Sequence, residues 1–290
     1  MTTVSIIIVL LSGLFHALRD FLNKRADNKA LFMWWYIAWA QVLPLPIYWH
    51  YLSKETITGI VLGVAFISGV VHVLYRIFLA KSLEYGDFSH VYPIARSAPA
   101  PVLLFSIIFL GEKVSFEGVV GILLITLGVY TINSKALSWS EFSSPMSSIF
   151  KDKASFYALL TLLSVAGYSI IDKKGTELLH PLSFFFLMEL FTFILFSFYL
   201  WQKGAMISLM SEMKKHPIAI PLSSILMVAS YAFILIAFTM SNVSYVVGLR
   251  QVSVIFAVLL GSLFFKERHT KIRLFSSMLI FIGAYFITIA

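Results

Sequence analysis

Two stretches of this chain decide its fold, and they resemble each other. Residues 89–132 read SHVYPIARSAPAPVLLFSIIFLGEKVSFEGVVGILLITLGVYTI, and residues 244–287 read SYVVGLRQVSVIFAVLLGSLFFKERHTKIRLFSSMLIFIGAYFI. At a constant offset of 155 residues, polar residues and glycines match: Ser89 with Ser244, Glu112 with Glu267, Lys113 with Arg268, Gly128 with Gly283 and Tyr130 with Tyr285. Each stretch holds two apolar runs around a short charged segment. The chain is therefore predicted to contain an internal repeat.

The composition of the whole chain indicates a membrane protein. Of 290 residues, 59% are hydrophobic and only 12% are charged, and the mean hydropathy is +0.89. A soluble domain carries about 25% charged residues, so the bilayer must be the solvent. The chain has no cysteine, which excludes disulfides and thiolate metal sites. The net charge of +8 sits in short clusters between apolar runs, so we predict a lipid bilayer and no nucleic acid as partner.

Apolar runs long enough to cross a bilayer, about 20 residues each, predict ten transmembrane helices. The predicted spans are residues 4–22, 31–52, 57–83, 88–110, 116–132, 154–171, 181–201, 217–240, 243–265 and 272–289. The first run lacks a basic region before it and a small-residue cleavage site after it. We therefore expect a retained span and no signal peptide.

The fold class predicted is an all-α polytopic membrane protein of two inverted-topology five-helix repeats. A serine-rich linker at residues 134–153 separates the repeats, residues 1–133 and 154–290. A looser match at an offset of 149 sets Asn23-Lys24 against Asp172-Lys173. Because five is odd, the second repeat enters the membrane from the opposite side. Such inverted repeats are typical of secondary transporters that work by alternating access.

The basic residues predict the orientation. Loops after the odd-numbered spans hold fourteen lysines and arginines, and the other side holds four. The positive-inside rule then places the odd loops in the cytoplasm and both termini outside. We expect a multi-pass protein of the plasma (inner) membrane, and the sequence leaves a homodimer open.

The repeated motif resembles the EamA domain of the drug/metabolite transporter superfamily. Its pattern is Gly-Glu after the fourth helix of a repeat, followed by a glycine-rich fifth helix. The first copy has Gly111-Glu112 followed by Gly118, Gly121 and Gly128, and the second has Lys266-Glu267 followed by Gly283. The resemblance covers essentially the whole chain and implies a transporter. Superfamily members are commonly drawn with both termini in the cytoplasm, opposite to the charge count.

A narrower likeness is to a subgroup of phosphonate-utilisation-associated membrane proteins. The shared features are His16-Ala17, Lys24-Arg25 and the segment GDFSHVYPIAR at residues 86–96. The subgroup usually has Trp-Asn where this chain has Arg19-Asp20. That departure falls where a substrate could be touched.

Three charged residues are predicted near the middle of the bilayer. Glu189 lies about 12 Å into its span, Arg96 at a similar depth from the opposite face, and Arg250 about 10 Å deep, at about 1.5 Å per residue. An ionisable group at that depth costs roughly 2.5–3.5 kcal/mol, so these side chains are expected to face a cavity or a partner.

The predicted substrate site combines these residues with polar and aromatic neighbours. The substrate-binding candidates are His16, Arg19, Asp20, Trp39, Tyr75, Arg76, Tyr92, Arg96, Glu189, Arg250 and Gln251. Arg96 and Arg250 would approach a central cavity from the two repeats, where paired guanidinium groups suit a carboxylate or phosphonate. Glu189, Asp20 and His72 are the proton-coupling candidates.

Simpler roles remain open for several of these residues. Arg19 and Arg76 could extend to the interface, and Glu189 could form a structural ion pair with an arginine. Arg19 and Asp20 are adjacent, so they are expected to point apart, with Asp20 pairing with Arg76. His72 could be a hydrogen-bonded packing residue.

Two further features concern the helix ends and bends. Lys173 and Lys174 are expected to be solvated loop charge. Bends are expected at Tyr92-Pro93 and at Gly248, as static kinks or as moving gates.

No catalytic motif, P-loop, cofactor fingerprint or metal-ligand spacing is present, so we predict no enzyme activity, cofactor or metal. The favoured function is a secondary transporter of a small anionic or zwitterionic solute, with proton coupling as an option. The alternatives are a carrier of organic cations or drugs, held by aromatic residues and Glu189, and a membrane-embedded enzyme or accessory subunit of an envelope-lipid pathway.

Overall fold

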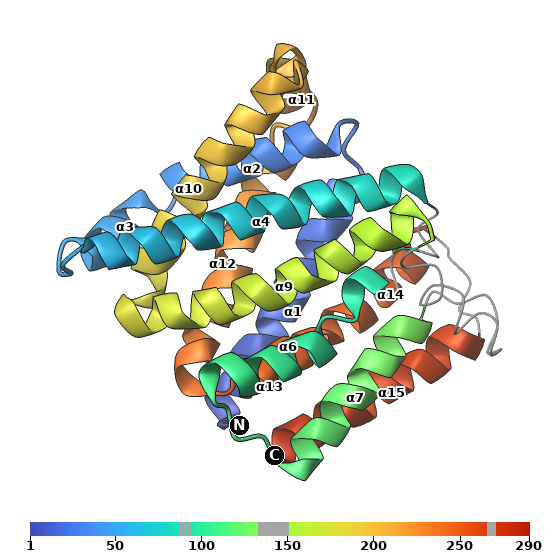
Figure 1. Cartoon of the computed structure of the whole chain (residues 1–290). Coiled ribbons are helices and arrows are strands. Elements are labelled where there is room, and N and C mark those ends of the chain that lie inside the picture. The colour runs from blue at the N-terminus through green and yellow to red at the C-terminus, as the bar shows by residue number, and fades with distance from the viewer. Residues whose placement is uncertain (87–90, 92–93, 133–150, 266–270) are drawn as a thin grey trace.

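A computed structural model describes residues 1–86, 91, 94–132, 151–265 and 271–290. Within these ranges the regular structure is helical (Figure 1). The first repeat contains α1 (Thr3–Lys24), α2 (Lys29–Val42), α3 (Leu45–Leu52), α4 (Gly59–Tyr85), α6 (Pro99–Phe105), the π-helical turn η1 (Ser106–Leu110) and α7 (Phe116–Thr131). The second repeat contains α9 (Lys153–Leu178), α10 (Pro181–Gln202), the 3₁₀ turn η2 (Ala205–Ser208), α11 (Leu209–Lys215), α12 (Ala219–Met240), α13 (Val243–Arg250), α14 (Val252–Phe265) and α15 (Lys271–Ile289).

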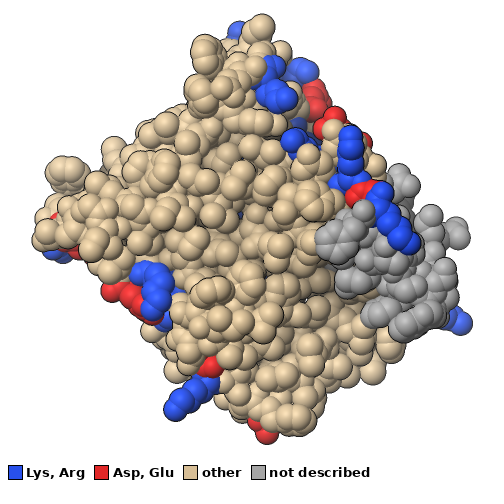
Figure 2. All heavy atoms as spheres, viewed as in Figure 1, with Lys and Arg blue, Asp and Glu red and all other residues tan. Residues whose placement is uncertain are grey.

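The helices match the lengths that a bilayer requires. Six of the described helices are long and apolar enough to cross a membrane, and the bent pair α2 and α3 can form a seventh span. Shorter apolar helices occupy the places of the remaining predicted spans. Figure 2 shows one face of the molecule, where uncharged residues form a broad band and charged side chains gather along its edges. The chain is a polytopic all-α membrane protein.

The repeats pack on each other with a pseudo-two-fold relation. The first helix of each repeat packs against the third helix of the other, as α1 does on α12 and α9 on α4. The fifth helices, α7 and α15, pack together. Both termini lie at the end of the molecule opposite α11 (Figure 1).

Glycines allow the fifth helices to touch at the backbone. A Cβ atom on Gly121 would lie 2.7 Å from the carbonyl oxygen of Gly283, and one on Gly128 would lie 2.7 Å from that of Ser276. These two contacts are equivalent in the repeat. The offset of 155 residues matches Gly121 with Ser276 and Gly128 with Gly283, so the first contact corresponds to the second. The glycines of the repeated motif therefore form the contact between the repeats, as small residues do in membrane helix pairs.

Polar side chains at helix starts explain several boundaries. Thr2, Asn28, Thr58, Ser115 and Asp152 each accept a hydrogen bond from a backbone N–H in the first turn of the helix that follows. Such caps satisfy donors that have no partner within the helix. Gly111, with φ of 65°, ends η1 in the left-handed conformation, as glycine does after many helices.

Three predicted boundaries were wrong. The second span is broken at Leu43-Pro44 and bent by 53°. The ninth span breaks at Gln251, between α13 and α14, and not at Gly248, which lies within α13. The sixth span does not end at residue 171, because α9 continues to Leu178.

The lysines beyond residue 171 consequently lie on a helix and not in a loop. Lys173 is mostly buried and donates to the carbonyl oxygen of Phe238 at 2.5 Å. Lys174 donates to Glu177 at 2.9 Å on the surface of the same helix. The helix continues because Asp172 is satisfied by groups inside the protein, as described below.

Candidate functional site

A cavity of about 1210 Å³ lies between the two repeats. Its wall is formed by residues of α1, α2, α4, α9, α10, α12, α13, α14 and α15, together with the segment before α6. Lys29, Lys203 and Arg273 line it at helix ends on the side that carries the basic loops. The cavity therefore extends toward the side that the charge count places in the cytoplasm.

Most of the predicted site residues line this cavity. Those on its wall are His16, Arg19, Asp20, His72, Tyr75, Arg76, Arg96, Glu189, Arg250 and Gln251. Trp39 does not line it, because its side chain packs against the apolar core and the neighbouring turn of α2 presents Tyr36 instead. Tyr92 and Pro93 lie outside the described residues.

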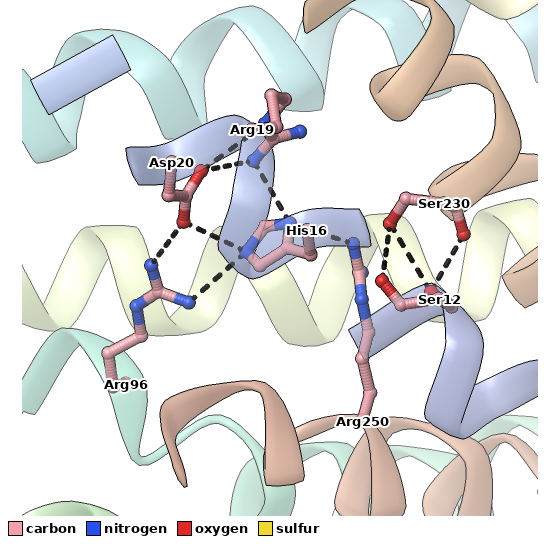
Figure 3. A network of polar contacts seen from close by, with 7 residues as sticks. All are labelled: Ser12, His16, Arg19, Asp20, Arg96, Ser230 and Arg250. Atoms are coloured by element: carbon pink, nitrogen blue, oxygen red, sulfur yellow. Dashed lines mark hydrogen bonds and ion pairs between the residues drawn. The ribbon is translucent and has the colours of Figure 1, made fainter. Parts of the chain in front are cut away.

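Three arginines converge on one histidine in the wall of the cavity (Figure 3). Arg19 Nη2 lies 2.9 Å from His16 Nδ1, and Arg250 Nη2 lies 3.3 Å from the same nitrogen. His16 Nε2 faces Asp20 Oδ2 at 3.3 Å. Since arginine only donates, His16 Nδ1 is the acceptor in both contacts. His16 Nε2 lies between Asp20 Oδ2 and Arg96 Nη1, and the latter is 3.5 Å away.

Asp20 is the carboxylate of this network. Arg19 Nη2 donates to its Oδ1 at 2.7 Å, and Arg96 Nη2 donates to its Oδ2 at 3.4 Å. Arg96 belongs to the first repeat and Arg250 to the second, so the two arginines meet at His16 on α1 from both halves (Figure 3).

The predicted pairing of Asp20 was wrong. Arg19 and Asp20 do not point apart, because the long arginine side chain folds back to its neighbour. Arg76 pairs with Glu189 and not with Asp20, at 3.4 Å between Nη2 and Oε1. Glu189 is buried and Arg76 is largely buried, and Arg76 Nη1 and Glu189 Oε2 have no hydrogen-bond partner among the described residues.

A third polar cluster, which the sequence analysis missed, is centred on Asp172. Its carboxylate is fully buried and accepts hydrogen bonds from Ser68 Oγ and the Tyr231 hydroxyl. His72 Nε2 lies 3.1 Å from Asp172 Oδ2, so His72 is hydrogen-bonded. The offset of 149 residues had matched Asp172 with Asn23, and that match was the available signal.

Aromatic side chains form the remaining walls of the cavity. Tyr36, Tyr168 and Tyr231 line it and were absent from the predicted site. The guanidinium carbon of Arg19 lies 5.9 Å from the Tyr36 ring, and that of Arg250 lies 5.6 Å from the Tyr231 ring. Aromatic residues occur throughout this sequence, at 16%, so their type alone could not identify those facing the cavity.

Basic residues outnumber acidic residues on the cavity wall. Arg19, Arg76, Arg96, Arg250, Lys29, Lys203 and Arg273 line it, with Asp20 and Glu189 as the acidic residues. Among the described residues, no group of three or more histidines or carboxylates is placed to hold a metal ion. The wall is suited to an anionic ligand.

Contacts between the repeats close the end opposite the basic loops. The backbone N–H groups of Val243 and Ser244, at the start of α13, donate to the Glu112 carboxylate at 2.5 and 3.3 Å. The Tyr245 hydroxyl accepts from the Ser115 N–H at 2.9 Å. A carboxylate at a helix N-terminus also interacts favourably with the helix dipole.

At the basic end, the loop before α2 contacts α11. Lys215 donates to Asp27 at 2.6 Å, and this hydrogen bond lowers the pKa of the exposed Asp27 carboxyl. The Trp35 indole N–H of α2 donates to the Leu209 carbonyl oxygen at 2.8 Å. These contacts join the two repeats, and their residues are not among those that line the cavity.

Comparison with known proteins places this arrangement in a family. The model of the EamA-like transporter family matches residues 3–134 and 152–289. A solved crystal structure of a protein 16% identical in sequence superposes with a TM-score of 0.70, over 100% of this chain and 98% of the other, which shows a shared fold. A search of curated proteins found no match. The narrower likeness to the phosphonate-associated subgroup stays a prediction.

Proposed function

Since the chain belongs to the EamA-like transporter family, within the drug/metabolite transporter superfamily, we propose that it carries a small anionic or zwitterionic solute. The solute would be a carboxylate, a phosphonate or an amino-acid-like molecule. It would cross the plasma (inner) membrane by alternating access, driven by the proton gradient. The observation that carries this proposal is the excess of arginine over carboxylate in the central cavity.

Of the three arginines around His16, Arg19 and Arg96 donate to Asp20, whereas Arg250 contacts the histidine. Arg250 Nε is buried and has no hydrogen-bond partner among the described residues. A buried donor without a partner is costly, and more so when it is charged. An anion bound between Arg96 and Arg250 would supply the missing acceptor and balance the charge.

The carboxylates in the cavity do not favour an organic cation. Asp20 contacts two arginines, and Glu189 is held by Arg76. Arginines also lie over the rings of Tyr36 and Tyr231, where a quaternary amine would bind. A cation would have to displace these arginines from the carboxylates or from the aromatic rings.

The conformation described here corresponds to one half of a transport cycle. The cavity reaches the side of the basic loops, while Glu112 and α13 close the other end. Exposing the site on the other side requires the Glu112 contacts to open and the helix ends around Lys29 and Lys203 to approach each other.

Thermal unfolding of the purified protein can identify the solute class. Methylphosphonate, succinate, glycine and choline would be compared, because a ligand at about 100 times its Kd adds about 2.7 kcal/mol of stability. We expect stabilisation by an anion or zwitterion and none by choline. The best stabiliser would then be followed by counterflow in proteoliposomes.

Arg250→Gln should weaken binding of that solute at least about tenfold, because it removes a charge-assisted hydrogen bond. Lys54→Gln is the matched control, since it also removes one positive charge but lies in an exposed position outside the cavity. Stabilisation by choline alone, or full binding by Arg250→Gln, would show that the assignment to anions is wrong.

A further inference from the structure

Asp172 differs from the other carboxylates inside the protein in the kind of cation that it contacts. Asp20 and Glu189 contact arginines, which stay charged at any physiological pH. Asp172 contacts His72, and imidazole is the side-chain group that proteins most often use to bind and release protons. The charge of the Asp172–His72 pair therefore depends on proton binding.

The charged neighbours of this pair on α9 and α4 bond to other groups. Lys173 follows Asp172 in sequence but is directed to the Phe238 carbonyl oxygen. Arg76 lies one turn beyond His72 and pairs with Glu189 of α10. Tyr168 of α9 stacks on His72 with the ring centroids 4.1 Å apart, and Tyr75 of α4 meets the edge of Tyr168.

The other facing groups come from α12, α13 and α1. Tyr231 of α12 donates its hydroxyl to Asp172 and also lies 3.2 Å from His72 Nε2. Arg250 of α13 lies over the Tyr231 ring, and beyond it is His16 of α1. Among the described residues, His72 is thus the basic side chain bonded to Asp172.

A proton on this buried pair would remove its net charge. With His72 neutral, the pair carries one negative charge near the middle of α4 and α12, where desolvation of an ion costs several kcal/mol. One proton taken from water makes the pair neutral overall. The desolvation cost of an unbalanced negative charge inside the membrane is then removed.

The pair is also placed for exchange with water. His72 and Tyr231 line the cavity, and Asp172 lies behind them. A proton entering from the basic side of the protein reaches the His72 ring first. The site is therefore accessible from one side of the membrane in this conformation.

We propose that Asp172 and His72 together form the proton-binding site that couples solute movement to the proton gradient. The coupling rests on the anion transport proposed above, whereas proton binding by the pair does not. Tyr231 connects the two sites, since it contacts Asp172 through its hydroxyl and Arg250 through its ring. One bound proton offsets one negative charge brought in by the solute.

Proton binding can be measured without knowing the solute. The protein would be labelled with ¹⁵N-histidine, placed in lipid nanodiscs and titrated by NMR, with the His72 signals assigned by their loss in His72→Gln. We expect His72 to titrate, and Asp172→Asn to weaken its proton binding at least about tenfold, as an adjacent opposite charge typically does. The double variant Arg76→Gln/Glu189→Gln, which alters the other buried pair, should leave the titration unchanged.

Two results would overturn the proton site. One is the absence of any His72 titration between about pH 4 and 9, a range around the ordinary value of histidine. The other is the same titration midpoint in Asp172→Asn as in the unaltered protein. If Asp172→Asn does not fold, Tyr231→Phe keeps the ring but removes one hydrogen bond to Asp172, and an unchanged midpoint in that variant would equally count against the site.

Coupling is tested with the stabilising solute in proteoliposomes. Asp172→Asn should lose uptake driven by a pH gradient but keep counterflow, which needs no gradient. Arg250→Gln should lose both. Gradient-driven uptake by Asp172→Asn would refute the coupling. Intact transport by Arg250→Gln would refute the anion site and leave the histidine titration standing.

Discussion

Arg76 and Glu189 form an ion pair with little access to water. Their side chains are 10% and 4% exposed, so neither charge can be solvated if its partner is removed. Removing one partner of a buried pair typically costs about 3–5 kcal/mol, while replacing both partners is often close to neutral. The pair can therefore be essential to folding even if it adds little net stability.

A pair of variants tests this at the level of single residues. Arg76→Gln should destabilise the protein by about 3–5 kcal/mol, because Glu189 then remains buried without a counter-charge. Adding Glu189→Gln should recover most of that loss. Thermal unfolding in detergent measures both effects, and a double variant no more stable than Arg76→Gln would contradict the explanation.

The arginines of the site could be predicted from sequence, and the contacts between them could not. Arg96 and Arg250 stand out because charge within an apolar run is costly, so their approach to a common cavity followed from depth alone. The predicted sixth span ends at residue 171, just before Asp172, because the apolar run ends there. Its burial depends on Ser68, His72 and Tyr231, which are about 60 to 104 residues away in the chain, and no local pattern reports such partners.

The contact between α7 and α15 determines how closely the two repeats approach. Gly121 and Gly283 meet backbone to backbone, so a side chain at either position must push the helices apart. A flexible side chain could move away from an added Cβ atom, but the carbonyl oxygen of a helical residue cannot. The spacing of these glycines in the repeated motif follows from this contact.

Alanine substitutions should have opposite effects at two glycines. Gly121→Ala should destabilise the protein by about 1–3 kcal/mol through overpacking. Gly63→Ala, on α4, meets nothing within 4 Å and should be neutral or stabilising, because alanine favours a helix over glycine by about 1 kcal/mol. Thermal unfolding compares the two, and equal destabilisation would show that the α7–α15 contact is looser than described.

The apolar runs predicted where helices form, but they did not predict where a helix is broken. Each predicted span has a helical counterpart, because backbone groups in lipid must be satisfied within the segment. The breaks at Leu43-Pro44 and Gln251 escaped prediction. Both lie inside predicted spans that are long and apolar enough to cross the membrane as one helix. The overall hydropathy of a span does not report where its helix bends.

At the scale of the whole molecule, the basic loops predict which compartment the cavity faces. The basic loops place its opening in the cytoplasm by the positive-inside rule, whereas the usual drawing of the superfamily implies the reverse. Lys54 and Lys203 lie on opposite sides, and both are exposed. The chain contains no cysteine, so a single introduced cysteine reports its own position.

Labelling intact cells with a membrane-impermeant maleimide should therefore modify Lys54→Cys and spare Lys203→Cys. Permeabilised cells should label both, which controls for reactivity. The reverse pattern in intact cells would place both termini in the cytoplasm and the present opening outside.

The basic cavity mouth has a kinetic consequence for the cell. Lys29, Lys203 and Arg273 surround the entrance, and their field extends about 8 Å into a solution of physiological ionic strength. Anions diffusing past are steered inward, so capture on this side should be fast in dilute buffer and slow as salt rises. Exit through the other end, where Glu112 is placed, gains no such attraction, and the two directions of travel would differ in their sensitivity to salt.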